Sequence, residues 1–101
     1  MAYNILWSSD AEDDLNGFLE EFRLEGKSAY TKGLIDSISK QMRLLSKMPR
    51  MFPVFNGEVR AAPLLKLPYM LFYIVNDKEK NIIIFGLLHQ RQDNNKIIGR
   101  H

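Results

Sequence analysis

Cysteine is absent from the 101 residues of this chain. Disulfide bonds, catalytic thiolates and cysteine-ligated zinc are therefore excluded, and the absence is typical of a cytoplasmic protein. No apolar run approaches the roughly 20 residues that a membrane-spanning helix needs. The N-terminal residues lack the basic and apolar regions of a secretory signal. We expect a cytoplasmic protein with no contact to a membrane.

Signs of a metal or cofactor site are also missing. The six glycines are scattered, so the sequence holds no glycine-rich loop that would cradle phosphates. The two histidines, His89 and His101, do not have the spacing of a metal-binding pair. The acidic run at residues 10–14 begins a predicted helix, where acids are favoured by the helix dipole alone. We expect no metal and no cofactor.

Charge is nearly balanced in total but not along the chain. The net charge is only +2, which argues against strong, sequence-independent DNA binding by the protein alone. Residues 10–25 hold seven of the twelve acids and one arginine, whereas residues 89–101 hold three Lys or Arg and one aspartate. The C-terminal part is therefore the part expected to meet an anionic or acidic partner.

The first half of the sequence predicts one strand and two helices. Residues 3–7 are aromatic and β-branched, which is typical of a strand. Ser9 and Glu12 have the spacing of a capping box, and Gly26 is placed to end the helix that starts there. A second amphipathic helix is predicted from 28 to 46. Two such helices joined by a few residues form an antiparallel hairpin.

The second half predicts the sheet that covers this hairpin. Strands are expected at 58–66, 69–75 and 82–88, the last of them apolar on both faces and therefore central. Residues 76–81 are a turn of hairpin length. Residues 93–101 are polar enough to form a flexible tail, but Ile97 and Ile98 in it could instead dock on the rest of the protein. The order β-α-α-β-β-β predicts a single α+β domain over 1–101. In it, an antiparallel helix hairpin packs on one face of a small, mainly antiparallel, twisted sheet.

Several phrases of the sequence, in this order, resemble the RelE/ParE superfamily of bacterial toxins. They are YNILWSSDAEDDL at the start, MP after the second helix, VR in the second strand, PYMLFYIV in the third and LLHQRQD at the end of the fourth. The resemblance extends from about Tyr3 to Asp93. Within the superfamily the chain is most similar to the ParE-like, plasmid-stabilisation branch.

This resemblance implies the toxin of a type II toxin–antitoxin system, held inactive by a ParD-like or RelB-like antitoxin. ParE-type members are associated with inhibition of DNA gyrase, and RelE-type members with cleavage of mRNA on the ribosome. Our first hypothesis is a gyrase-binding toxin without enzymatic activity. The second is a metal-independent endoribonuclease, and the third is a member that has lost toxicity. One fold can support all three, so the site must decide between them.

The residues expected to face the target are Arg60, His89, Arg91, Gln92 and Lys96. For a nuclease, His89 would act as acid or base, while Arg60 and Arg91 would hold the phosphate. Lys66 and Lys96 are the other cations considered for this role. Each residue also has a structural interpretation: Arg60 can cover apolar surface or pair with a carboxylate, and His89 can satisfy a backbone group.

Two departures from the family pattern weigh against the nuclease. Residues 51–63 contain a single arginine, Arg60, where RelE-like ribonucleases carry several basic residues. A basic pair often follows the histidine in ParE-like members, but here Arg91 is followed by Gln92. Gln92 is also the feature that keeps the hypothesis of lost toxicity open.

Residues 48–56 are expected to form a loop that is more apolar than a solvated connection should be. We predict that Met51, Phe52, Val54 and Phe55 in this loop bind the antitoxin. The alternative is that the loop folds back and covers the protein's own core.

Overall fold

The computed structural model describes residues 2–100, and it confirms the predicted α+β fold. The elements are β1 (Asn4–Trp7), α1 (Ser9–Leu24), α2 (Ser28–Lys47), β2 (Val54–Asn56), β3 (Val59–Pro63), β4 (Tyr69–Asn76), β5 (Asn81–His89) and the 3-10 helix η1 (Asn94–Ile97). The short strand β2 lies in the segment for which the sequence predicts a loop. None of the helices in the described residues is long and apolar enough to cross a lipid bilayer.

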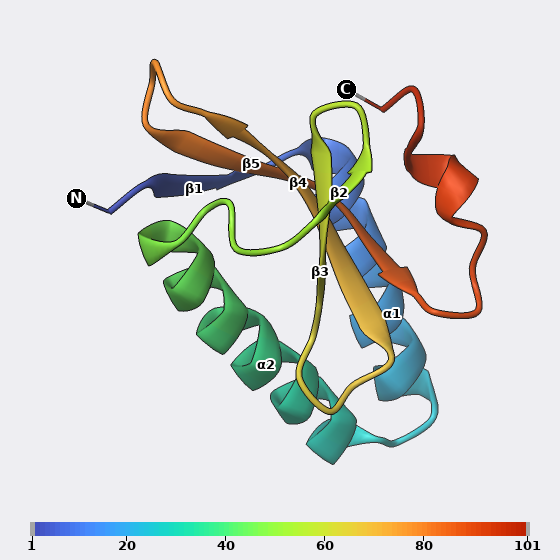
Figure 1. The fold of residues 1–101 in the computed structure, drawn as a ribbon. Coiled ribbons are helices and arrows are strands. Elements are labelled where there is room, and N and C mark those ends of the chain that lie inside the picture. Colours follow the sequence, from blue (N-terminus) through green and yellow to red (C-terminus); the bar gives the residue numbers. More distant parts are fainter. Residues whose placement is uncertain (1, 101) are drawn as a thin grey trace.

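The five strands form one sheet in the order β1-β5-β4-β3-β2 (Figure 1). β1 pairs with β5 in parallel, and all other neighbours are antiparallel. β5 lies between β1 and β4, as its apolar residues on both faces predict. The sheet is therefore mainly antiparallel, with one parallel pair at the β1 edge.

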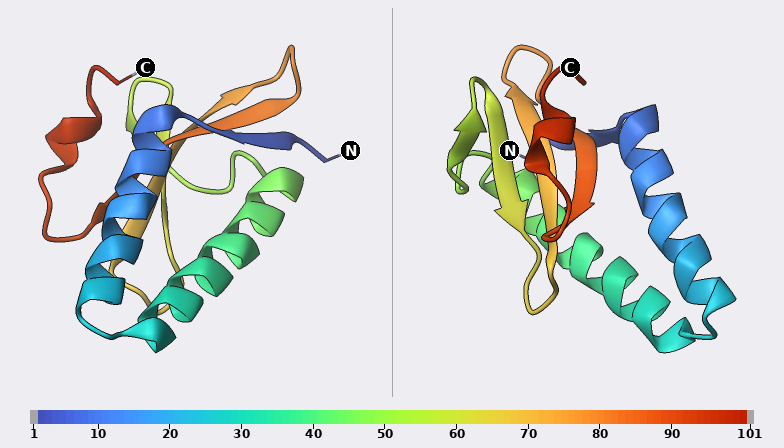
Figure 2. Two further views of the ribbon diagram at one scale, coloured as in Figure 1. Left: turned by 180° about the vertical axis from the view of Figure 1, so that it is seen from behind. Right: turned by 90° about the vertical axis from the view of Figure 1, so that its right-hand side faces the viewer.

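Both helices pack on the same face of this sheet (Figure 2). The core between the two layers is formed by buried side chains from α2, β4 and β5: Leu34, Ile38, Leu45, Leu71, Tyr73, Ile82, Ile84 and Leu87. Each fully buried aliphatic side chain contributes about 1.5–3 kcal/mol to folding. The apolar stripes of the helices and the helix-facing residues of the strands thus stabilise one another.

The start of α1 corrects one detail of the prediction. Ser8, not Ser9, is the N-cap, and its hydroxyl accepts a hydrogen bond from the Ala11 amide at 3.1 Å. The residue three positions after Ser8 is alanine, so no reciprocal capping box forms. At the other end, Gly26 adopts φ +68°, a conformation that glycine reaches without strain, and the helix ends as predicted.

The opposite face of the sheet has its own apolar cluster, which η1 covers. Ile97 is fully buried there against Phe72, Phe85 and Leu88. η1 approaches so closely that a Cβ on Gly86 would overlap with Ile97 Cδ1. Of the two alternatives for the tail, the structure has the docked one, because Ile97 gains burial by folding back onto the sheet.

An ion pair takes the place of a neighbouring strand where β1 ends. β1 accompanies β5 only as far as Ile84. Beyond that point Asp14 Oδ2 accepts a hydrogen bond from the Leu87 amide at 3.0 Å, and Arg100 Nη1 donates to the Phe85 carbonyl at 3.2 Å. The two side chains also pair with each other at 2.7 Å. Backbone groups at this edge of a central strand are satisfied in this way.

Candidate functional site

The C-terminal end of β5 positions His89 beside an aromatic chain. His89 is opposite Tyr69 in the antiparallel register, and the two rings meet edge to face with centroids 5.1 Å apart. Tyr69 in turn contacts the Phe18 ring of α1 at 4.9 Å. Alternation along the strands places these rings on the helix-covered face. The imidazole is therefore half-buried and held in one orientation.

The turn after β5 engages both His89 and Gln92 in hydrogen bonds. The His89 amide donates to Gln92 Oε1 at 2.8 Å, and the Gln92 amide donates to the His89 carbonyl at 2.8 Å. The Arg91 amide donates to His89 Nδ1 at 3.1 Å. Since Nδ1 accepts this bond, the neutral ring carries its proton on Nε2. Gln92 thus closes the turn, which gives its side chain a structural role, while the Arg91 side chain is exposed.

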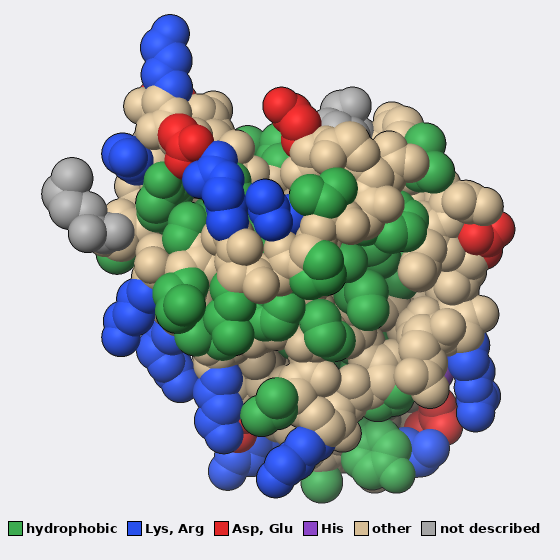
Figure 3. Space-filling view, viewed as in Figure 1, with side chains coloured by type: hydrophobic (Ala, Val, Ile, Leu, Met, Phe, Trp, Pro, Cys, Tyr) green, Lys and Arg blue, Asp and Glu red, His purple; other side chains and the backbone are tan. Residues whose placement is uncertain are grey.

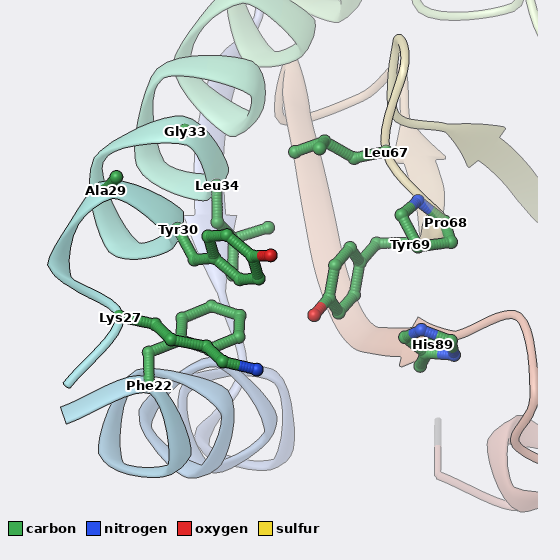
Figure 4. Close-up of a pocket in the computed structure, with 10 residues that line it drawn as sticks. All are labelled: Phe22, Lys27, Ala29, Tyr30, Gly33, Leu34, Leu67, Pro68, Tyr69 and His89. Atoms are coloured by element: carbon green, nitrogen blue, oxygen red, sulfur yellow. The ribbon is translucent and has the colours of Figure 1, made fainter. Parts of the chain in front are cut away.

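Two hollows that share lining residues open next to His89, between the helix hairpin and the ends of β4 and β5. The first has a volume of about 340 Å³, and Figure 4 shows Tyr30, Tyr69, Lys27 and His89 around it. The second, of about 520 Å³, shares Lys27, Tyr69 and His89 and extends to Arg91. The lining of the first hollow is mostly apolar or aromatic, whereas charged and polar side chains, among them Glu21 and Glu25, make up most of the lining of the second. Such a composition suits the binding of a partner side chain or a small ligand.

Electrostatics at the rim are mixed. Lys27 Nζ pairs with Glu25 at 3.0 Å and lies 5.2 Å from the centroid of the Tyr30 ring. The hydrogen bond to Glu25 raises the pKa of Lys27, and burial raises the pKa of Tyr69. Lys27 is therefore a cation and Tyr69 a neutral phenol at physiological pH. Within residues 2–100 Arg91 has no ion pair, so it presents a positive charge to solvent.

Arg60 lies in a different part of the sheet. Its guanidinium donates to the carbonyls of Phe52, at 2.7 Å, and Arg50, at 3.4 Å. Arg60 pairs with Tyr73, which is four residues along β4 from the Tyr69 that faces His89. Four residues of a strand span about 13 Å. The structure therefore brings His89, Arg91 and Gln92 together but does not add Arg60 to them.

The other two cations considered lie on other elements than His89. Lys66 lies in the turn between β3 and β4, where it is exposed and has φ +63°. Lys96 is an exposed residue of η1, whose Ile97 packs on the face opposite the helices. Among residues 2–100 there is also no group of three His, Cys, Asp or Glu side chains suited to a metal.

The side chains of the predicted antitoxin segment point in two directions. Phe52 packs against the main core, and Phe55 packs edge to face on Phe72 with centroids 5.2 Å apart. Met51 and Val54 are 50% and 53% exposed. The segment thus covers the core with its rings and leaves a smaller apolar surface at the β2 edge. Antitoxin binding through Met51 and Val54 stays a prediction.

Sequence reasoning missed the part of the site that comes from the helix hairpin. Lys27 and Tyr30 are far from His89 in sequence and belong to no motif. The apolar pattern of 69–75 assigns Tyr69 to the core, although the predicted hairpin with 82–88 already implies that its first residue faces the end of the last strand. The predicted pairing of these two strands is the one feature of the sequence that places Tyr69 next to His89.

A comparison with protein-family models gives a match over residues 5–94 to the ParE toxin of the type II toxin–antitoxin system parDE. The chain belongs to the ParE toxin family. It is therefore a toxin of the ParE/RelE superfamily, and the resemblance noted from the sequence is confirmed. No curated protein matches the chain in a sequence comparison.

Solved structures of this superfamily share the fold. A chain of the chromosomal ParDE system from P. aeruginosa has a TM-score of 0.71 at 18% identity, covering 87% of this chain and 96% of that one. The RelBE2 toxin–antitoxin complex from Mycobacterium tuberculosis gives 0.62 at 16% identity, covering 88% and 99%. A mutant of E. coli RelE in the free state gives 0.61 at 19%, covering 90% and 86%. At these identities the likeness concerns the fold alone.

Proposed function

We propose that this ParE-family toxin acts by binding DNA gyrase, without chemistry of its own, and that a ParD-like antitoxin neutralises it. The contact surface is the end of β5, where Arg91 is exposed and the turn at His89 and Gln92 holds its backbone. Gyrase follows from the association of ParE-type members with that enzyme. A cytoplasmic location of the toxin also fits its lack of cysteine.

The main support for this proposal is that the basic side chains considered for a nuclease lie on different elements of the fold. RNA cleavage without a metal needs a base and several cations around one phosphate. Arg60 donates to backbone carbonyls, and its place in the sheet separates it from His89. Lys66 and Lys96 lie on other elements. Arg91 can therefore steer and hold a partner, but it lacks the companions that a phosphoryl-transfer site requires.

For the antitoxin, we propose contact with the apolar surface at the β2 edge. β2 is an outer strand of the sheet, and the exposed Met51 and Val54 lie at it or just before it. A partner strand can pair with such an edge while its side chains cover these two residues. The solved relatives of this fold include toxin–antitoxin complexes, in which a toxin and its antitoxin are bound together.

One observation supports the alternative of an endoribonuclease. Lys27, Tyr69, His89 and Arg91 line the same 520 Å³ groove. Two of these side chains are cations and two can exchange a proton, so a nucleotide bound there would meet some of the groups that cleavage uses. The ion pair of Lys27 with Glu25 weakens this case, because the nearest lysine is already neutralised.

Controlled expression in a bacterium tests the proposal with a matched pair of variants. Arg91→Ala removes an exposed charge at the β5 end, and Lys78→Ala removes one from the turn between β4 and β5. We expect wild type and Lys78→Ala to stop growth and induce the DNA-damage response with intact transcripts. Arg91→Ala should need at least about tenfold more protein for the same effect, which corresponds to about 1.4 kcal/mol of binding free energy.

Several results would count against the proposal. Truncated transcripts at the onset of growth arrest would favour the endoribonuclease. Equal potency of both variants would remove the β5 end from the target interface. Normal growth at high expression, with the protein folded, would support the loss of toxicity instead.

A further inference from the structure

The two helices of the hairpin carry charges of opposite sign. Residues 10–25, which include most of α1, hold seven acids and one arginine, whereas residues 27–50 hold six Lys or Arg and a single acid, Asp36. Among residues 2–100 no ion pair joins α1 to α2. The positive charge of α2 is therefore not neutralised by the neighbouring helix.

The cations of α2 form a stripe along its outer side. Lys32, Lys40, Arg43 and Lys47 are all exposed, and at 3.6 residues per turn they fall within about 80° of arc. From first to last they span about 22 Å of helix. Figure 3 shows Lys and Arg side chains gathered along the lower left margin of the molecule, over α2, with apolar side chains beside them. We call these four residues the basic stripe.

An apolar groove runs beside the basic stripe. It has a volume of about 440 Å³ and lies between α2 and the turn at 64–68, with Leu44, Leu65 and Leu67 among its lining residues. Lys40 and Lys66 also line it, one on each element. Leu65 is 76% exposed, more than any other large apolar side chain in the described part of the chain. Cations and exposed leucine thus share one surface.

The turn that presents Leu65 is fixed in place. Gln41 of α2 is buried, and its Nε2 donates to the Pro63 carbonyl at 2.6 Å. The Leu64 amide donates to the Tyr69 carbonyl at 2.9 Å. Lys66 holds a left-handed conformation, with φ +63°, that a lysine rarely adopts. A strained but anchored turn that exposes a leucine is a feature expected at a binding surface.

We propose that the basic stripe and this groove bind an acidic amphipathic helix of a partner protein. Carboxylates on the partner would face Arg43 and Lys47, whose four-residue spacing matches acids at i and i+4 on a second helix. Apolar side chains next to those acids would enter the groove around Leu65. β3 is paired on both sides, by β2 and β4, so no strand edge is open here and a helix fits better than a strand.

This surface is independent of the proposed contact with gyrase. It uses none of His89, Arg91 and Gln92. Nucleic acid is a poorer occupant than an acidic amphipathic helix, because the exposed Leu65 has no apolar counterpart on a phosphate backbone. The basic stripe and the groove would instead give the toxin a second surface, apart from the end of β5, for contact with a protein.

A designed peptide tests this surface directly. The probe is a fluorescein-labelled helical peptide with glutamate on one side and leucine on the other, titrated with the full chain and followed by fluorescence anisotropy. We expect saturable binding that weakens with added salt. Lys40→Glu and Leu65→Ser should each raise the Kd at least about fivefold. Lys78→Glu, the same charge reversal in the β4–β5 turn, should leave the Kd within about twofold of wild type.

The controls separate this surface from general electrostatic attraction. Circular dichroism checks that each variant is folded. Equal weakening by Lys78→Glu, or no effect of Leu65→Ser, would overturn the proposal, because binding would then depend on net charge alone. Equal affinity for a peptide with lysine in place of glutamate would do the same. A DNA duplex that binds more tightly, and loses affinity on Lys40→Glu, would reassign the surface to nucleic acid.

Discussion

Gly86→Ala is a direct test of how the C-terminal segment packs on the sheet. The added Cβ would overlap with Ile97 Cδ1 and lie 3.5 Å from Ile97 Cγ1. Carbon atoms attract at separations of about 3.5–4.0 Å, so Ile97 must leave its position or η1 must shift. Overpacking of this kind costs about 1–3 kcal/mol of unfolding free energy. We expect a loss of about 2 kcal/mol, out of about 5–15 kcal/mol for a typical domain.

The second half of this test is a double-mutant cycle with Ile97→Ala. Ile97 is fully buried, and its truncation alone should cost about 2–5 kcal/mol. This truncation also removes Ile97 Cδ1, the atom that the new methyl group would overlap. The double mutant should therefore lose about 1–2 kcal/mol less than the sum of the single losses.

Trp7 provides the assay for this cycle. It is the only tryptophan of the chain, it is half-buried, and its Nε1 donates to the sulfur of Met42 at 3.3 Å. Its fluorescence should change on unfolding in urea, and the midpoint and slope give the free energy. Strictly additive losses, or a Gly86→Ala protein as stable as wild type, would refute the packing of η1 against Gly86.

Two further predictions concern single side chains. Arg60→Ala should lower the unfolding free energy by about 1 kcal/mol, because the Phe52 carbonyl loses its hydrogen-bond donor. Inhibition of gyrase by the folded variant should stay unchanged, and weaker inhibition would place Arg60 in the interface with gyrase. Hydrogen bonds from Arg50 and Tyr3 lower the pKa of Asp77 from 3.8 to about 2. The ionised Asp77 carboxylate therefore stabilises the fold above pH 3.8, and this stabilisation is lost as the pH falls toward 2. Asp77→Asn should show a smaller drop in urea midpoint than wild type between about pH 5 and about pH 2.5; equal drops would contradict this role.

The layers of the fold are predictable from the sequence, because each depends on a local periodic pattern. The stripe of Leu34, Ile38 and Leu45 identifies α2, and the double-sided run at 82–88 identifies the central strand. The short strand β2 is not predicted, since three residues of a strand carry too little pattern and its pairing with β3 sets it. Ile97 gives a weaker signal, because its burial depends on Gly86, a residue of another element.

The functional site is predictable only in part. His89 and Arg91 are neighbours in sequence, so their common location needs no tertiary information. Arg60 shares their charge, which groups it with them in the sequence, and only the strand register shows that it faces Tyr73 instead. Lys27 and the basic stripe of α2 become visible once the hairpin is placed on the sheet, since no motif marks them.

We have proposed that this protein inhibits gyrase by binding through the end of β5. The most direct measurement is a titration of gyrase supercoiling of plasmid DNA with the purified toxin, wild type beside Arg91→Ala and Lys78→Ala. We expect inhibition by wild type and Lys78→Ala at similar concentrations, and at least about tenfold weaker inhibition by Arg91→Ala. Full supercoiling activity at saturating wild-type toxin would contradict it.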